Sequence, residues 1–348
     1  MIFVWLRHDC LWGWSRAVAA IMREQGGRSS FNFSYTPCDR YVMTPEEWWK
    51  NFALGIEIDA AGTFIYNGIR SLHELSALNH SVDIFMVLYD LSVGLERLLK
   101  VAIILLEHTD QIDIEQFEES LISHSTIDLA NRVNTKRNLA LADVHREFLS
   151  LLSKFYKSHR YGRYSFRAVP NISEEKLDFL RFLTKYLKVT LDLESESTWI
   201  ENTNQVRRFV GKVVKKISDE VFAVVRQRAQ ELNIYTDEIR GDSKALKVFY
   251  GSRLDFLDQD IKKKELLHYL MSEKVSGNHF ELLRSVEALN LDPNMVPSYI
   301  KALLNEAYLS YVEDEIDELY TDVVNVQERL GFMSIIDSEY LSYGGEDE

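Results

Sequence analysis

Residues 82–108 read VDIFMVLYDLSVGLERLLKVAIILLEH, and apolar side chains occur on nearly every side of this stretch when it is drawn as a helix. Such a helix belongs inside a bundle, because a surface helix needs a polar face. The few polar residues, among them Glu96, Arg97 and Lys100, therefore need partners. We expect Arg97 to be structural, since a buried guanidinium requires a carboxylate or several carbonyl groups. The stretch predicts the central helix of an all-α protein.

The composition agrees with this fold class and bounds the number of domains. The 348 residues are 46% hydrophobic and 27% charged, with only 5 prolines and 15 glycines, so we expect mostly helix and few tight turns. The length favours two domains, and one large helical body is the alternative. We predict an irregular segment over residues 1–40, a helical bundle over 41–194, a C-terminal helical domain over 199–340 and an acidic tail over 341–348.

Two cysteines, Cys10 and Cys38, are too few for a disulfide framework or a four-thiolate zinc site, which favours a reducing compartment. The first residues lack the order and length of a secretory signal, and the apolar run 101–106 is too short to cross a membrane. We therefore expect a cytoplasmic protein without a membrane partner. Either Met1 or Met22 is the translation start.

Local signals place several helix boundaries. Thr44-Pro45-Glu46-Glu47 has the pattern of a capping box with proline in the first turn, which predicts a helix start. Gly55 and Gly62 are expected to bracket a break, followed by a helix over residues 63–78. A long helix is predicted over residues 202–232.

A first candidate site is the segment 156–164, which reads YKSHRYGRY. The cations His159, Arg160 and Arg163 alternate with tyrosines, and arginine suits phosphate while tyrosine can stack on bases. The segment is thus a candidate site for RNA or a nucleotide. The alternative, which we favour slightly, is a helix end whose cations complement the helix dipole.

A second candidate is the basic character of the predicted helix 202–232 in a chain of net charge −14. We consider four of its cations, Arg207, Arg208, Lys212 and Lys215, as contacts for an RNA backbone or for the acidic stretch 313–318 of a neighbouring chain. The alternative, which we favour, is that the basic helix packs beside the acidic stretch of its own chain.

Other common kinds of site are not indicated. No histidine has a second His or Cys at the helical spacing used for zinc, so no metal site is predicted. Glycine-rich phosphate loops, dinucleotide turns and serine-hydrolase elbows are absent from the sequence, and no cofactor is predicted.

Three stretches resemble the HEPN superfamily of small helical bundles. They are the run from Leu91 to His108, the helix start His124-Ser125-Thr126-Ile127-Asp128-Leu129, and the helix end Phe155-Tyr156-Lys157-Ser158-His159-Arg160-Tyr161. The likeness covers about residues 60–170, and implies that the first helical domain is a HEPN-like bundle. Ribonucleases of the family carry an arginine with a histidine about five to seven residues later. Here Arg137 and His145 come nearest, eight residues apart.

For HEPN-like proteins without that motif, the resemblance implies binding roles or parts in toxin–antitoxin and phage-defence systems. Our first hypothesis is an RNA-directed or nucleotide-binding component of a bacterial defence or stress-response system. If it cuts RNA, metal-independent transesterification is the expected reaction. His159, Arg160 and Arg163 would then bind and polarise the phosphate, with His145 or His124 as general base. The alternative is a non-catalytic helical module that forms a homo-oligomer or binds a partner protein.

Overall fold

The computed structural model describes residues 44–109, 112–159, 174–187, 200–234, 243–272, 284–305 and 308–334, together with residues 239, 281 and 336. Over this part of the chain the protein is all-α, as predicted. It contains one isolated β-bridge, between Ala77 and Glu201, and no strand among the described residues. The predicted irregular segment 1–40 and the acidic tail 341–348 lie outside the described residues.

The helices of the body follow one another closely along the chain. They are α2 (Pro45–Trp48), η1 (Trp49–Ala53), α3 (Leu54–Glu74), α4 (Ser81–Glu107), α5 (Ile114–Ser120), α6 (Thr126–Lys136), α7 (Asp143–Lys154), η2 (Phe155–His159), α9 (Glu174–Leu187), α10 (Asn204–Glu231) and α11 (Lys244–Tyr250). The predicted capping box is present, because the Thr44 side chain accepts from the Glu47 N–H while the Glu47 carboxylate accepts from the Thr44 N–H.

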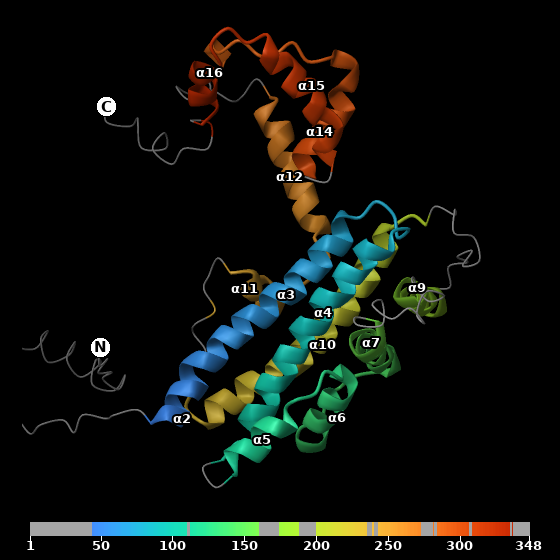
Figure 1. The fold of residues 1–348 in the computed structure, drawn as a ribbon, viewed down its shortest axis with the longest axis vertical. Helices are drawn as coiled ribbons and strands as arrows, with labels where there is room; N and C mark the ends of the chain where they lie inside the picture. The colour runs from blue at the N-terminus through green and yellow to red at the C-terminus, as the bar shows by residue number, and fades with distance from the viewer. Residues whose placement is uncertain are drawn as a thin grey trace, which may run out of the picture.

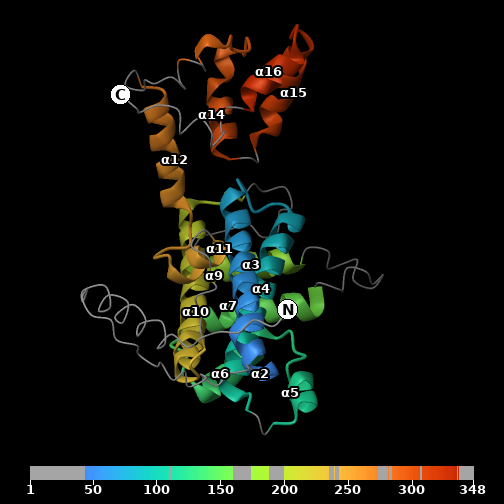
Figure 2. The ribbon, with the colours of Figure 1, turned by 90° about the vertical axis from the view of Figure 1, so that its left-hand side faces the viewer.

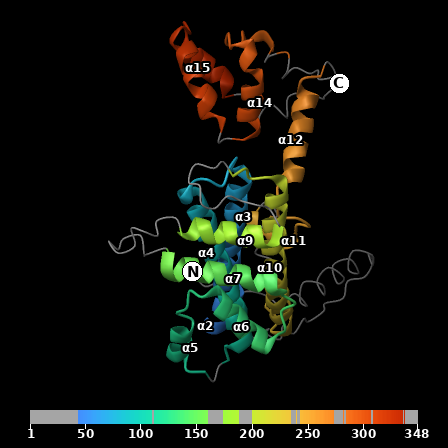
Figure 3. The same ribbon diagram turned by 90° about the vertical axis from the view of Figure 1, so that its right-hand side faces the viewer.

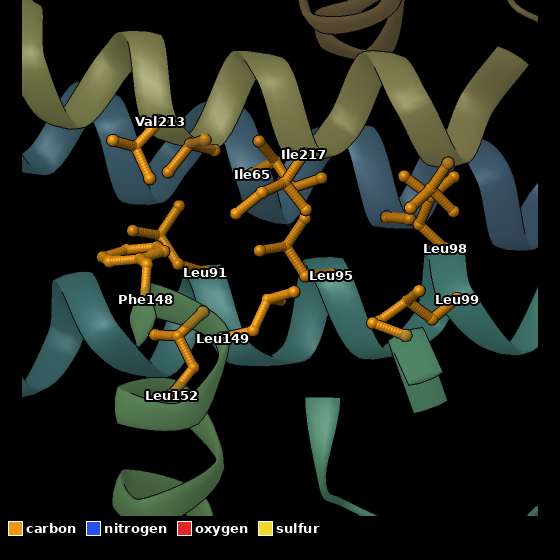
Figure 4. Packing of buried hydrophobic residues seen from close by; sticks show 14 of the residues in the cluster. Ile65, Leu91, Leu95, Leu98, Leu99, Phe148, Leu149, Leu152, Val213 and Ile217 are labelled. Atoms are coloured by element: carbon orange, nitrogen blue, oxygen red, sulfur yellow. The ribbon is translucent and has the colours of Figure 1, made fainter. Parts of the chain in front are cut away.

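The predicted central helix is α4, and its position confirms the interpretation of residues 82–108. It packs against α3, α6, α7, α9 and α10, so that helices surround it on several sides (Figure 1). Figure 4 shows its leucines between α10 and α3 on one side and α7 on the other. Leu91, Leu95 and Leu98 are completely buried. Each such side chain contributes roughly 1.5–3 kcal/mol through burial.

The break predicted between Gly55 and Gly62 is wrong, because both glycines lie inside the continuous helix α3. Gly62 serves close packing instead of a turn. A Cβ built there would lie 2.5 Å from the Cα of Ala245 in α11. Glycine therefore lets the backbones of α3 and α11 touch, at the modest cost that glycine imposes on a helix.

The predicted boundary between the two domains falls at residues 195–198, among residues 188–199 that the structure does not describe. Helices from both sides of it contribute to one hydrophobic core. Val213 and Ile217 of α10 are buried in the same cluster as Leu95 of α4 and Ile65 of α3 (Figure 4). The helix predicted over residues 202–232 is confirmed as α10.

The last helices extend beyond one end of the body (Figures 2 and 3). They are α12 (Leu257–Leu270), η4 (Pro293–Met295), α14 (Val296–Leu304), α15 (Ser310–Thr321) and α16 (Val326–Met333). α12 begins directly after Phe256, whose backbone is left-handed with φ 55°. The Phe256 ring packs edge-on against Tyr66 of α3 at 4.8 Å between ring centroids, which anchors the start of α12 on the body.

Candidate functional site

The predicted phosphate-binding residues can be placed only in part. Arg160 and Arg163 lie outside the described residues. The backbone of His159 ends η2, and its side chain is not described. The first residue of the segment, Tyr156, lies in η2, which continues α7. Its ring stacks on His124 in the loop that precedes α6.

His145 occupies the opposite end of that helix. Its Nδ1 accepts a hydrogen bond from the Ala142 N–H at 3.1 Å, so the ring caps the first turn of α7. Burial lowers the pKa of His145, and nearby Lys216 lowers it further. Eleven residues separate His145 from Tyr156, or roughly 16 Å of helical rise. His145 is thereby held apart from the segment that begins at Tyr156, and the structure gives it a capping role.

The four cations considered for RNA on α10 divide into two pairs. The Arg207 guanidinium donates to the Leu75 carbonyl at 2.9 Å, and burial lowers its pKa. Lys215 forms an ion pair with Asp219 on its own helix. Arg208 and Lys212 are exposed. Since two of the four have partners within the chain, only Arg208 and Lys212 point to solvent.

The positive charges of α10 are balanced largely within the helix itself. The acidic stretch 313–318, which was predicted to lie beside it, does not supply the partners described below. Cations of α10 pair with carboxylates one turn further along the same helix, as in Lys216–Glu220 at 2.6 Å and Arg228–Glu231 at 2.7 Å. Within the acidic stretch, Glu315 accepts from the Tyr299 hydroxyl at 2.7 Å. Local pairs of this kind contribute little individually, about 0.3–0.5 kcal/mol.

The structure assembles a different polar group beside η2, which we call the His124 cluster: Glu96, Lys100, His124 and Tyr156. Nδ1 of His124 lies 3.1 and 3.2 Å from the two carboxylate oxygens of Glu96. Lys100 donates to the same carboxylate at 2.7 Å. The imidazole stacks on the Tyr156 ring, with 4.6 Å between centroids and 29° between planes. Three separate elements, α4, the start of α6 and η2, thus meet at one histidine.

The burial of this cluster is graded from the core to the surface. The Glu96 side chain is 10% exposed, whereas that of His124 is 50% exposed. A carboxylate at Nδ1 orients the imidazole and leaves Nε2 facing away from Glu96 for a bound molecule. Next to Tyr156, the exposed Lys157 pairs with Asp128 at 3.3 Å. The arrangement suits proton transfer by an exposed imidazole that lies on the buried Tyr156 ring, beside the Lys157–Asp128 ion pair.

A second polar contact joins α3 to α12. Nε2 of His73 lies 2.6 Å from the Asp260 carboxylate, and the His73 side chain is only 5% exposed. Burial, as the largest effect, lowers the pKa of His73 even though the bond to Asp260 raises it. Because the ring is enclosed, this contact joins two elements and is not open to a substrate.

Sequence reasoning named His124 as one possible general base but missed Glu96 and Tyr156 as its partners. A glutamate in an otherwise apolar helix was the available signal. That signal showed that Glu96 needed a partner. It did not show that the partner would be His124, which lies 28 positions further along the chain. His73 and Asp260, 187 positions apart, gave no signal of this kind.

Two further observations concern only the residues that the structure describes. Among them, no group of three or more His, Cys, Asp or Glu side chains is placed to hold a metal ion. None of the described helices has the length and apolar character needed to span a membrane. Comparison of the chain with protein-family models, with curated proteins and with solved structures found no match in any of the three.

Proposed function

We propose that the protein is a HEPN-like, RNA-directed component of a bacterial defence or stress-response system, and that RNA binds at the His124 cluster. The observation that supports this is a half-exposed histidine whose Nδ1 faces a buried carboxylate and whose face lies on a tyrosine ring. The exposed His124 ring can stack on an unpaired base, and Lys157, which is exposed and pairs with Asp128, can exchange that partner for phosphate. The segment that continues through His159, Arg160 and Arg163 supplies further cations in this proposal.

The proposed reaction is metal-independent transesterification of single-stranded RNA. Nε2 of His124 removes the proton from a ribose 2′-hydroxyl, and the 2′-oxygen attacks the adjacent phosphorus. The bond from phosphorus to the 5′-oxygen breaks, and the leaving oxygen takes up a proton. The products are a 2′,3′-cyclic phosphate and a free 5′-hydroxyl. Glu96 positions the imidazole through its contact with Nδ1.

The test uses the full chain with labelled single-stranded RNA oligonucleotides in the presence of EDTA. We expect cleavage that leaves 2′,3′-cyclic phosphate ends. His124→Ala should lower the rate by about 10²–10⁴-fold, the usual contribution of a general base. Glu96→Gln should lower it less, because Glu96 acts only by positioning the imidazole. His268→Ala, at an exposed histidine of α12, is the matched control and should cleave at the wild-type rate.

Two results would contradict this proposal. One is a wild-type protein that neither binds nor cleaves RNA of any sequence tested. The other is a His124→Ala variant with unchanged activity, because a contaminating nuclease gives that result.

A second candidate function, a helical interaction module that oligomerises, is favoured by a separate observation. Within the described residues 257–336, only Leu257 and Val312 are buried hydrophobic residues. Large apolar side chains in the same region are exposed, including Leu266 at 59% and Leu303 at 73%. Exposed apolar surface on this scale is typical of an interaction site. Size-exclusion chromatography with light scattering tests it, and a monomer at every concentration would exclude self-association.

A further inference from the structure

The helices that follow α11 share no hydrophobic core with the body in the part of the chain that the structure describes. The hydrophobic cluster of the body ends at Phe256, and α12 then extends away from the bundle (Figures 2 and 3). Without a shared core, the position of the C-terminal helices on the body depends on a small number of individual contacts.

Those contacts gather at the C-terminal end of α3. Nε2 of His73 lies 2.6 Å from the Asp260 carboxylate in the first turn of α12. The side-chain amide of Asn305, which follows α14, donates to the Glu74 carbonyl at 3.4 Å. Just before α12 begins, the Phe256 ring lies 5.8 Å from the His73 ring. One place on the body therefore holds both the start of α12 and the end of α14.

The surroundings of His73 accept a neutral ring and not a charged one. A neutral imidazole has a single N–H, and here that N–H is donated from Nε2 to Asp260. Nδ1 is enclosed and finds no hydrogen-bond partner among the described residues. A second proton would have to reside on Nδ1, where it would be buried without an acceptor, which is costly.

The charged groups that face His73 come from three helices. Burial is the largest effect and lowers the pKa of His73, and the guanidinium groups of Arg207 on α10 and Arg70 on α3 lower it further. Asp260 on α12 acts in the opposite direction. Arg70 is itself paired with Glu74 at 2.5 Å. If the ring moved into solvent, its pKa would return to the ordinary value of about 6.5, so protons favour separation of α12 from α3.

We propose that His73 and Asp260 form a pH-sensitive latch, which holds the C-terminal helices on the body while His73 is neutral and releases them at mildly acidic pH. On release, both ring nitrogens gain water as partners, and Asp260 leaves with α12. Phe256 stays in the core of the body, so the pivot lies directly after it. The latch is a conformational device that depends on neither of the two candidate functions.

The experiment measures the distance between the body and the C-terminal helices in the full chain by double electron–electron resonance. Spin labels are attached at Gln205→Cys on α10 and Tyr311→Cys on α15, which are exposed positions, in a chain with Cys10→Ser and Cys38→Ser. Lowering the pH from 7.5 to 5.5 should add a second population of distances. The ratio of open to closed molecules should rise by up to about tenfold, the change in protonation of a histidine with the ordinary pKa.

Three substitutions in the labelled chain separate the latch from other causes. Asp260→Ala removes the acceptor and should give the open population at both pH values. Asp258→Ala is the matched control, because Asp258 is an exposed carboxylate of the same helical turn that pairs only with Arg253, at 3.3 Å. It should behave like the unsubstituted chain. His73→Gln keeps a donor for Asp260 but cannot titrate, so it should stay closed at both pH values.

Three results would overturn the latch. They are equal distances in Asp260→Ala and Asp258→Ala at pH 7.5, equal distances at both pH values in the unsubstituted chain, and acid opening of the same size in His73→Gln. Far-UV circular dichroism distinguishes opening from unfolding. The helical signal should be the same at pH 7.5 and pH 5.5, and its loss together with the change in distance would also overturn the proposal.

Discussion

Glu96 shows how one carboxylate in an apolar helix is stabilised. It sits buried on α4, where an ionised carboxylate without partners would cost several kcal/mol. Lys100 and His124 both contact it, so its negative charge is balanced at the edge of the core. Arg97, one residue further, turns to the surface and pairs with Glu57 at 2.5 Å. The polar residues of α4 therefore mark where the central helix meets its neighbours.

At the scale of single residues, His73 predicts a dependence of stability on pH. Its pKa in the folded protein is lowered below the ordinary value of 6.5, chiefly by burial, with Arg207 and Arg70 adding to the effect and Asp260 opposing it. As the pH falls below 6.5, the unfolded chain binds a proton that the folded chain does not. The free energy of unfolding should therefore decrease between pH 7 and pH 5.

His73→Gln removes this titration while keeping a donor for Asp260. Urea denaturation at pH 7 and pH 5 should show a smaller loss of stability in His73→Gln than in the wild type. The difference amounts to about 1.4 kcal/mol for each unit by which the pKa is lowered. His268→Gln, at the exposed histidine of α12, should retain the wild-type slope. An equal slope in His73→Gln would show that other groups carry the pH dependence.

At the scale of elements, α4 carries the core, and truncation of one of its leucines should be costly. Leu95 is fully buried between α3, α7 and α10, so Leu95→Ala leaves a cavity. We expect a loss of about 2–5 kcal/mol in the free energy of unfolding, measured by urea denaturation. Met86→Ala on the exposed side of the same helix should change it by less than about 0.5 kcal/mol. Similar losses in the two variants would mean that α4 is not central.

Replacing glycine by alanine should have opposite effects at two helical positions, Gly62 in α3 and Gly331 in α16, because only the first is in close contact with another helix. Gly62→Ala forces a methyl group against the Ala245 backbone, and we expect it to destabilise the protein by about 1–3 kcal/mol. Gly331→Ala in α16 meets no atom within 4 Å, so the better helix propensity of alanine should stabilise that helix by up to about 1 kcal/mol. Thermal unfolding of the first variant and amide hydrogen exchange in α16 of the second provide the measurements. A stable Gly62→Ala protein would show that α11 can move away.

At the scale of the whole molecule, α10 connects the two halves of the chain. Val210, Val213 and Ile217 are buried against the first helices, so residues 1–199 alone would expose the surface that α10 covers. We expect a fragment of residues 1–199 to aggregate or to lack a cooperative thermal transition. A fragment of residues 1–256, which keeps α10 and α11, should fold cooperatively. Cooperative folding of the shorter fragment would support an independent domain ending near residue 194.

The sequence by itself determined the fold class and the central element. Continuous apolarity over residues 82–108 indicates a helix inside a bundle, and this property belongs to the helix alone. Only its first turns, at Val82 and Met86, carry exposed apolar side chains. The capping box at Thr44 is likewise a local pattern, because its two hydrogen bonds join residues three positions apart. Local patterns of this kind can be recognised without knowing what packs where.

Only the tertiary structure decided the rest, because the relevant contacts join residues far apart in the chain. Gly62 indicates a break when only its neighbours are considered, whereas Ala245, 183 positions later, explains why it lies inside a helix. His124 acquires its chemistry from Glu96 and Tyr156, which lie on two other helices. Helical periodicity specifies which face of each helix is buried, but it does not specify which helix covers that face. The candidate site depends on that choice of neighbours.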